Sequence, residues 1–400
     1  MTISTTQIFR LGINAILDQQ EGLARTQLQI ASGKRIQTPS DDPSGAVKVI
    51  DIQEQIATAE QHLRNGQFAR TELSLEEGAM TGAQNVIQRV RELMIQANND
   101  TQSEGTRQGI ATEIRARRDE LLALANARNA SGDYLFAGFK LDSQPFSLSG
   151  GSVIYSGDQG QRRIQVGPSS LVPVSDSGVD VFQLIKTGNG ILTADDTAGN
   201  TGSGTVKSLS QNSGFVSDTY TLNIIQLAAT DPITYEVRDA AAALVSSGTY
   251  ESSEAIAFNG ISMVVEGVPA NGDSFTVSPS TNQDIFTTLN NIIVALEAPS
   301  TELADNASLH NDMNEGLNNI DQALDNFLRV RSNIGSRLNN LDSQNEVNEN
   351  FLLRMKAAIS ETQDLDFAEA ISRLSSQATS LEAAQKVFVE VQSLSLFNFL

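Results

Sequence analysis

Few residues of this 400-residue sequence have the types and spacing that catalysis or metal binding requires. The only histidines, His62 and His310, fall in helical polar patterns, which favours surface positions over metal binding or proton transfer. The adjacent carboxylates Asp41-Asp42 and Asp195-Asp196 could chelate a cation, although helix capping and loop solvation explain them first. Residues 199–207 are rich in glycine but lack the Gly-Lys-Ser/Thr ending of a phosphate-binding loop. We therefore predict no catalytic residue, no metal site and no cofactor.

The composition excludes further classes of protein. The absence of cysteine rules out disulfides, thiolate metal sites and cysteine nucleophiles. A net charge of -21 repels nucleic-acid phosphates and anionic lipids, so we predict neither a nucleic-acid nor a membrane partner. The first 17 residues contain neither a basic segment, nor an unbroken apolar run, nor a small-residue cleavage site, which predicts no cleaved signal peptide. Taken alone, these features predict a cytoplasmic protein.

The first part of the chain, residues 2–128, has the apolar spacing of helices, with Gly and Pro at the breaks. Gly33 is placed to end the first helix, because glycine accepts the positive φ that follows a helix. Asp42 can cap the next helix and Pro43 fits its first position. The apolar positions of the first helix follow a 3–4 spacing, with steps of three or of three plus four: Ile13, Ile16, Leu23 and Ile30.

The middle of the chain, about 140–283, is predicted to be a β domain. The apolar period there shortens to two, and turn signals such as Asn259-Gly260 and Asn271-Gly272-Asp273 separate the runs. Residues 195–213, rich in Gly, Thr and Asn, are predicted to form an exposed loop.

The last part of the chain returns to the helical period. A seam from Leu317 to Ile359 alternates steps of three and four, as coiled coils do. A final amphipathic helix follows, and residues 394–400 are too apolar to be a free tail, so another surface must cover them. We predict that the helices of both chain ends pair and expose an assembly seam, which includes Ile13, Ile16, Leu23, Ile30, Leu338, Leu341, Phe388, Val391 and Leu394.

Particular motifs resemble those of the bacterial flagellin family. Residues 28–36 (LQIASGKRI), followed by 40–46 (SDDPSGA), resemble the N-terminal flagellin signature. Residues 334–340 (IGSRLNN) are similar to its C-terminal glycine-alanine-x-x-asparagine stretch, from which Ser336 and Leu338 depart.

Further motifs resemble the branch of this family that forms the hook–filament junction. They are YLFAGF at 134–139, QPF at 144–146, YSGD at 155–158, GVDVF at 178–182 and PANGDSFTV at 269–277.

The resemblance implies an α+β fold, in which both chain ends form a flagellin-like helical coiled-coil stalk and a β-rich domain is inserted in the middle. Residues 1–42 with 358–400 would form a terminal helical domain, and 43–139 with 284–357 a helical coiled-coil domain. Residues 140–283 would form the β-rich domain.

The resemblance also implies a non-enzymatic building block of the flagellum outside the cell. The implied partners are flagellin, the other hook-associated junction protein, copies of the same chain in a ring or helical lattice, and the export chaperone and apparatus. Export of the unfolded chain without a cleaved signal would replace the cytoplasmic prediction, and a chain without cysteine suits that route.

Two alternatives remain open from the sequence. One is a flagellin subunit of the filament itself, against which the YSGD and PANGD motifs argue. The other is a surface adhesin with a carbohydrate-binding β domain at 140–283. An enzyme is the least favoured class, because no catalytic constellation is found.

Overall fold

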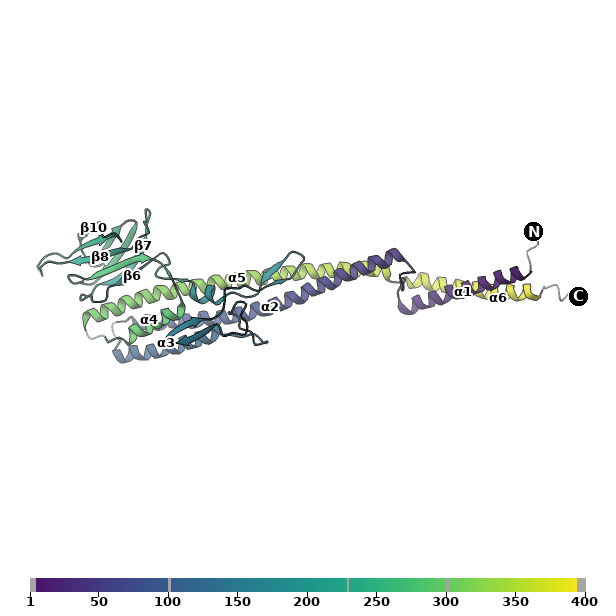
Figure 1. Cartoon of the computed structure of the whole chain (residues 1–400), viewed down its shortest axis with the longest axis horizontal. Helices are drawn as coiled ribbons and strands as arrows, with labels where there is room; N and C mark the ends of the chain where they lie inside the picture. Colours follow the sequence, from purple (N-terminus) through teal and green to yellow (C-terminus); the bar gives the residue numbers. More distant parts are fainter. Residues whose placement is uncertain (1–4, 100–101, 229, 300–301, 394–400) are drawn as a thin grey trace. The chain divides into compact units, whose positions relative to one another are not determined.

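Two long helices, α2 (Pro43–Ala97) and α5 (Leu303–Gln363), run through most of the helical part of the protein (Figure 1). This computed structural model describes residues 5–99, 102–228, 230–299 and 302–393. Its contacts divide the chain into two units, one of residues 1–64 and 344–400 and the other of residues 65–343. Each long helix therefore contributes to both units.

In the first unit, α1 (Thr5–Ser32) packs alongside α6 (Phe367–Ser393) (Figure 1). Gly33 follows α1 with a φ of 69°, which confirms the predicted helix end. Asp42 also caps as predicted, because its Oδ1 accepts the backbone N–H of Gly45 at 2.9 Å, two residues after Pro43 begins α2. This hydrogen bond lowers the pKa of Asp42 from its usual value.

The connector between α1 and α2 pairs with the connector between α5 and α6. The backbone N–H of Arg35 donates to the carbonyl of Gln363 at 2.7 Å, and that of Leu365 donates to the carbonyl of Gly33 at 3.0 Å. Gly45 lies beside this junction, where a Cβ atom would come within 2.5 Å of Asp42 Oδ2. The glycine of the SDDPSG motif is therefore a steric requirement of the helix start.

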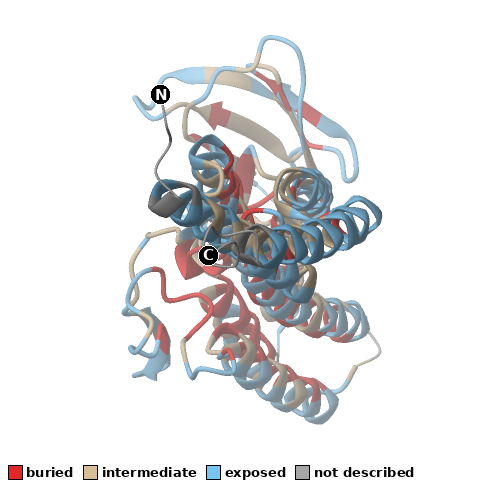
Figure 2. Cartoon of the chain, turned by 90° about the vertical axis from the view of Figure 1, so that its right-hand side faces the viewer, coloured by how far each residue is buried: buried red, intermediate tan, exposed pale blue. Residues whose placement is uncertain are grey.

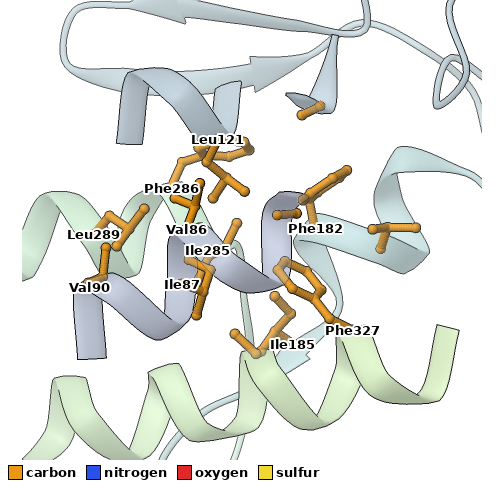
Figure 3. Packing of buried hydrophobic residues seen from close by; sticks show 14 of the residues in the cluster. Val86, Ile87, Val90, Leu121, Phe182, Ile185, Ile285, Phe286, Leu289 and Phe327 are labelled. Carbon is orange, nitrogen blue, oxygen red and sulfur yellow. The ribbon is translucent and has the colours of Figure 1, made fainter. Parts of the chain in front are cut away.

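In the second unit, α2 and α5 form a hydrophobic core with α3 (Glu104–Ala125) and α4 (Ile285–Glu297). Figure 3 shows side chains of these helices converging with Phe182, which lies in a one-turn π-helix (Val179–Gln183). Five phenylalanines pack ring to ring in this core, with centroids 5.2–6.1 Å apart: Phe136, Phe146, Phe182, Phe286 and Phe327.

Three short antiparallel strand pairs accompany this helical core. They are β1 (Phe146–Ser149) with β2 (Ser152–Tyr155), β3 (Arg163–Gln165) with β4 (Leu171–Pro173), and β5 (Ile185–Lys186) with β14 (Asn282–Gln283). Their buried side chains, among them Phe146, Val172 and Ile185, belong to the helical core. The strand-rich middle of the sequence therefore contributes to two different cores.

The second core lies between two antiparallel sheets. One sheet has the order β10-β9-β8-β13-β6, and the other has the order β11-β12-β7. The strands are β6 (Leu192–Asp196), β7 (Thr205–Gln211), β8 (Tyr220–Ile225), β9 (Thr234–Arg238), β10 (Leu244–Thr249), β11 (Ala255–Phe258), β12 (Ile261–Glu266) and β13 (Ser274–Pro279). Alternate side chains point inward, as in β8, and form a cluster that runs from Leu192 to Val277.

The structure confirms the predicted turns and corrects two predictions. Asn259-Gly260 forms a two-residue hairpin turn with positive φ at both positions, and Gly272 also has a positive φ. The loop predicted at 195–213 is shorter, because β7 occupies Thr205–Gln211. His62 was predicted to be a surface residue but is buried on α2.

Candidate assembly surface

Helices α1 and α6, which come from opposite ends of the chain and lie side by side, are called the α1–α6 hairpin below. The rings of Phe9 and Phe388 lie 4.9 Å apart, and Phe388 also covers Gly12, where a Cβ atom would come within 2.9 Å of the ring. A glycine is therefore required where the phenylalanine ring crosses α1. Near the other end of α1, the Thr26 hydroxyl donates to Gln377 Oε1 at 2.8 Å.

This hairpin leaves most of its apolar surface exposed. Among the described side chains of α1, the only buried ones are polar, and on α6 only Ala370 is buried. Figure 2 shows the helices nearest the labelled chain ends coloured largely as exposed. The exposed apolar side chains are Phe9, Leu11, Ile13, Leu17, Leu28, Phe367, Ile371, Val387 and Val389, five of them more than 55% exposed. An apolar surface of this extent on a two-helix hairpin indicates an interaction surface.

The predicted seam residues fall into three groups. On α1, Ile13 is exposed, and Ile16, Leu23 and Ile30 are half-buried. On α6, Phe388 is half-buried against Phe9, Val391 belongs to the helix, and Leu394 lies outside the described residues. On α5, Leu341 is fully buried and Leu338 is half-buried against the helical core of the second unit.

The structure adds hairpin residues that the sequence reasoning missed. Phe9 continues the spacing of Ile13 and Ile16 backwards by four residues, so the pattern contained a signal for it. Thr26 and Gln377 gave no such signal, because a polar pair across two helices is visible only once the helices are aligned. The assignment of the seam residues to assembly contacts stays a prediction.

A buried network of charges joins α2, α5 and the segment around β3 and β4 in the second unit. Arg337 donates two hydrogen bonds to the carboxylate of Asp176, at 2.8 and 2.9 Å. The backbone N–H of Asp176 donates to Glu76 Oε1 at 3.0 Å, and burial together with the neighbouring Asp176 carboxylate raises the pKa of Glu76 to about 8. Glu72, one turn earlier on α2, accepts hydrogen bonds from Asn129 and Arg162.

The β domain is anchored to α5 by asparagine side chains. Asn311 accepts the backbone N–H of Val206 at 2.7 Å, and Asn314 donates to the carbonyl of the same residue at 3.2 Å. Val206 lies on β7, the edge strand of the three-stranded sheet. A third asparagine, Asn319, accepts the backbone N–H of Gly188 at 2.6 Å. Backbone groups that would otherwise lack partners are thus satisfied by the helix.

Acidic side chains of β6 and α5 lie close together beside this anchor. Burial raises the pKa of Glu315, and so do the charge of the nearby Asp195 and the hydrogen bond that Asp195 shares with Glu315; together they bring this pKa to about 7. Burial and the charges of Asp196 and Asp195 raise the pKa of Asp312 to about 6. Burial also raises the pKa of Asp196, although Ser308 and Asn311 donate hydrogen bonds to its carboxylate. Because all these groups carry the same charge, ionisation of Glu315 weakens the contact.

The pKa of Glu315 predicts a pH-dependent stability. A carboxyl whose pKa is raised by folding binds more protons in the folded state, so the stability it contributes falls as pH rises from about 4.5 to about 7. Glu315→Gln should therefore melt at a higher temperature than the unmodified protein at pH 8 and at a similar temperature at pH 5. The measurement is thermal unfolding of both proteins across this pH range.

The exposed carboxylate Glu251 of the β domain offers a matched control for this experiment. Glu251→Gln should change the melting temperature equally little at both pH values. A Glu315→Gln protein that melts below the unmodified protein at pH 8 would contradict the prediction.

The glycine-rich segment 199–207 does not form a phosphate cradle. The backbone N–H groups of Thr201 and Gly202 donate to the buried carboxylate of Asp273, at 2.8 and 3.0 Å. The chain thus supplies its own anion to this loop, and β7 begins within the segment, at Thr205.

Within the described ranges, no group of three or more His, Asp or Glu side chains is arranged to hold a metal ion. In the same residues, no helix is both long and apolar enough to cross a lipid bilayer.

Family models match both helical ends of the chain. Residues 3–140 match the bacterial flagellin N-terminal helical region, and residues 317–400 match the C-terminal helical region. Paired terminal helices around an inserted β-rich region define a protein of the flagellin class.

Relatives that align with this chain over nearly their whole length show which family of the flagellin class it belongs to. The flagellar hook-associated protein 3 of Escherichia coli is 26% identical over 100% of this chain and 99% of its own length. The crystal structure of the flagellar junction protein FlgL from Legionella pneumophila is 36% identical, with a TM-score of 0.72 over 79% of this chain and 99% of that one. The structure of Xanthomonas campestris FlgL is 32% identical, with a TM-score of 0.73 over 77% and 99%. The chain belongs to the flagellar hook-associated protein 3 family.

Proposed function

We propose that this chain is a structural subunit of the bacterial flagellum that connects the hook side to the flagellin filament at the hook–filament junction. The observation that carries this proposal is the α1–α6 hairpin, which leaves large apolar side chains such as Leu11, Leu28 and Val389 exposed within the described part of the first unit. In a junction, neighbouring subunits would bury these side chains, which stabilises an assembly by about 1.5–3 kcal/mol for each large side chain. The role is mechanical, and no reaction is part of it.

The proposed partners are flagellin on one side, the other hook-associated junction protein on the other side, and further copies of this chain in a ring or helical lattice. Terminal helical regions of the flagellin type support this arrangement, because they allow one subunit to continue the packing of a flagellin lattice. The flagellar export chaperone and the export apparatus would be transient partners.

We place the working location of the chain outside the cell, in the flagellum, after export without a cleaved signal peptide. Export as an unfolded chain favours proteins that refold without help from disulfides, and this sequence has no cysteine.

The three-part domain division is also a proposal. The pairing of α1 with α6 supports a terminal helical domain of residues 1–42 with 358–400, although α5 continues to Gln363. The helical core supports a coiled-coil domain of 43–139 with 284–357. For the β-rich domain, 140–283, the separate core spans Leu192 to Val277.

Deleting the gene from the organism that carries it tests this function. We expect cells that still assemble hooks but carry no filaments and release flagellin monomers into the medium. A plasmid copy of the intact gene should restore the filaments. The measurements are electron microscopy of the cell surface and immunoblots of flagellin in the medium.

Two other results would favour the alternatives. Hooks with junction proteins but no flagellin in cells or medium would indicate that the chain is the filament subunit. Intact filaments on cells that no longer adhere to surfaces would indicate an adhesin.

A further inference from the structure

The β domain is joined to the helical core of the second unit by a neck of two chain segments, residues 185–191 and 280–283. In this neck β5 leads into the domain and β14 leads out of it, and the two strands pair over two residues each. Next to them, the backbone N–H of Thr187 donates to the carbonyl of Thr281 at 3.0 Å. Among the described residues, no buried side chain belongs to both hydrophobic cores. Domains that share no large apolar interface move relative to one another, so the orientation of the β domain depends on its polar contacts with α5.

The contacts between the β domain and α5 are of two kinds. The hydrogen bonds of Asn311, Asn314 and Asn319 do not depend on pH, because an amide does not titrate. The second kind is a hydrogen bond between two carboxyl groups, that of Asp195 on β6 and that of Glu315 on α5. An ionised carboxylate only accepts hydrogen bonds, so this bond needs a proton on one of the two groups. One contact across the interface therefore exists only in a protonated form.

The other acidic side chains of the interface carry the same charge. Asp312 lies one turn before Glu315 on α5, and Asp196 follows Asp195 on β6. Burial and the charges of both β6 aspartates raise the pKa of Asp312 to about 6, and the pKa of Glu315 is about 7. As the pH rises toward 8, the interface therefore gains negative charge and loses the proton that joins its two sides.

Lys207 on β7 is the one basic side chain among the described residues that line the two cavities beside Glu315. It lines the cavity of about 280 Å³ but forms an ion pair with Glu266 at 2.9 Å. In the other cavity, the described side chains of α4 are uncharged, among them Thr288 and Asn291. The described residues around Glu315 thus provide no unpaired cation that could take the place of the proton.

We propose that the β domain is a hinged module whose docking on α5 depends on a proton held between Asp195 and Glu315. With this proton in place, the shared hydrogen bond and the asparagine contacts hold the domain against the helix. When the proton passes to solvent, two carboxylates face each other, and the domain swings away about the neck while its own core stays folded. Because the docked state binds more protons, docking weakens by up to about tenfold per pH unit for each such carboxyl, for Glu315 between pH 4.5 and about 7.

Hydrogen exchange of the purified full chain tests this proposal, with EDTA present so that no divalent cation replaces the proton. After correction for the intrinsic pH dependence of exchange, the amides of Val206 and Gly188 should lose about tenfold or more of their protection between pH 5.5 and pH 8.5. The reason is that Asn311 and Asn319 accept these two N–H groups only in the docked state. The amides of β8 and β13, which lie inside the five-stranded sheet, should keep their protection.

Two variants remove the need for the shared proton from opposite sides of the hydrogen bond. Glu315→Gln and Asp195→Asn each supply an amide donor that does not titrate, so each should preserve the protection of Val206 and Gly188 at pH 8.5. Asp325→Asn, which changes an exposed carboxylate on the same helix, should behave like the unmodified protein.

A distance measurement separates a hinge motion from local fraying of β7. The chain has no cysteine, so Thr112→Cys with Ala241→Cys places two dyes on exposed positions of α3 and of the β domain. Energy transfer between single pairs of dyes should give one narrow distribution at pH 5.5 and a broader one at pH 8.5. Glu315→Gln should keep the distribution narrow at both pH values.

Four results would each overturn the proposal. They are a dye distance that does not change with pH, equal protection of Val206 and Gly188 at both pH values, a loss of protection in both amide-donor variants as large as in the unmodified protein, and a loss that extends to β8 and β13. The last result would show that the domain unfolds and does not swing.

Discussion

Replacing Arg337 with Met should lower the free energy of unfolding by about 3–5 kcal/mol, the loss expected when one partner of a buried ion pair is removed. Asp176 would keep its carboxylate in the core, with Gln161 as its one remaining side-chain donor among the described residues. Glu76, whose second oxygen already lacks a partner, would lose a nearby positive charge. The measurement is urea unfolding at pH 7, followed by circular dichroism.

A matched exposed pair gives the control for this prediction. Arg91 on α2 pairs with Asp321 on α5 at 2.6 Å, and both side chains are more than 40% exposed. Arg91→Met should cost less than about 1 kcal/mol, because solvent screens an exposed pair. The double variant Arg337→Met with Asp176→Asn should recover part of the loss. Equal losses for Arg337→Met and Arg91→Met would show that burial of the network contributes nothing.

Replacing Phe388 with Glu should abolish filament formation while leaving the second unit folded. The ring of Phe388 packs on Phe9 and over Gly12, so a charged side chain there opens the hairpin that presents the apolar surface. In an assembly this defect repeats at each subunit, so we expect swimming and filament number to fall to those of a deletion strain. The measurements are motility in soft agar and filament counts by electron microscopy.

Glu382→Gln on the same helix serves as the control, because Glu382 is paired with Lys386 and both side chains are exposed. This variant should swim normally. Thermal unfolding of the purified Phe388→Glu protein should retain the main transition, since the cores of the second unit do not involve α6. Normal filaments made by Phe388→Glu would contradict the assignment of the hairpin to assembly.

The helices and their ends could be predicted because their causes are local. Gly33, Asp42 and Pro43 act within a few residues of their own position, and the alternation of three and four along α5 is visible in the sequence. The α+β fold class followed from the same patterns and is confirmed. The strands could be predicted less completely, because an apolar period of two does not say which of the two cores a strand faces. Residues 146–186 therefore read like the strands of the β domain, although their side chains join the helical core.

The charged and polar contacts could not be predicted because their partners are distant in the sequence. Glu76, Asp176 and Arg337 are separated by at least a hundred residues, and each alone fits an exposed position. His62 illustrates the same limit, since a polar residue in a helical pattern gives no sign that a neighbouring helix covers it.

The asparagines that bind β7 also affect how copies of the chain interact at high concentration. An edge strand with free backbone groups is a template on which another chain can add a strand, and that hazard grows with local concentration. Subunits of a polymer meet one another at concentrations far above those in dilute solution. Because Asn311 and Asn314 occupy the N–H and the carbonyl of Val206, these two groups of the edge strand are closed to a strand from an adjacent copy. The anchor of the β domain therefore also acts as a guard against misassembly into sheet aggregates.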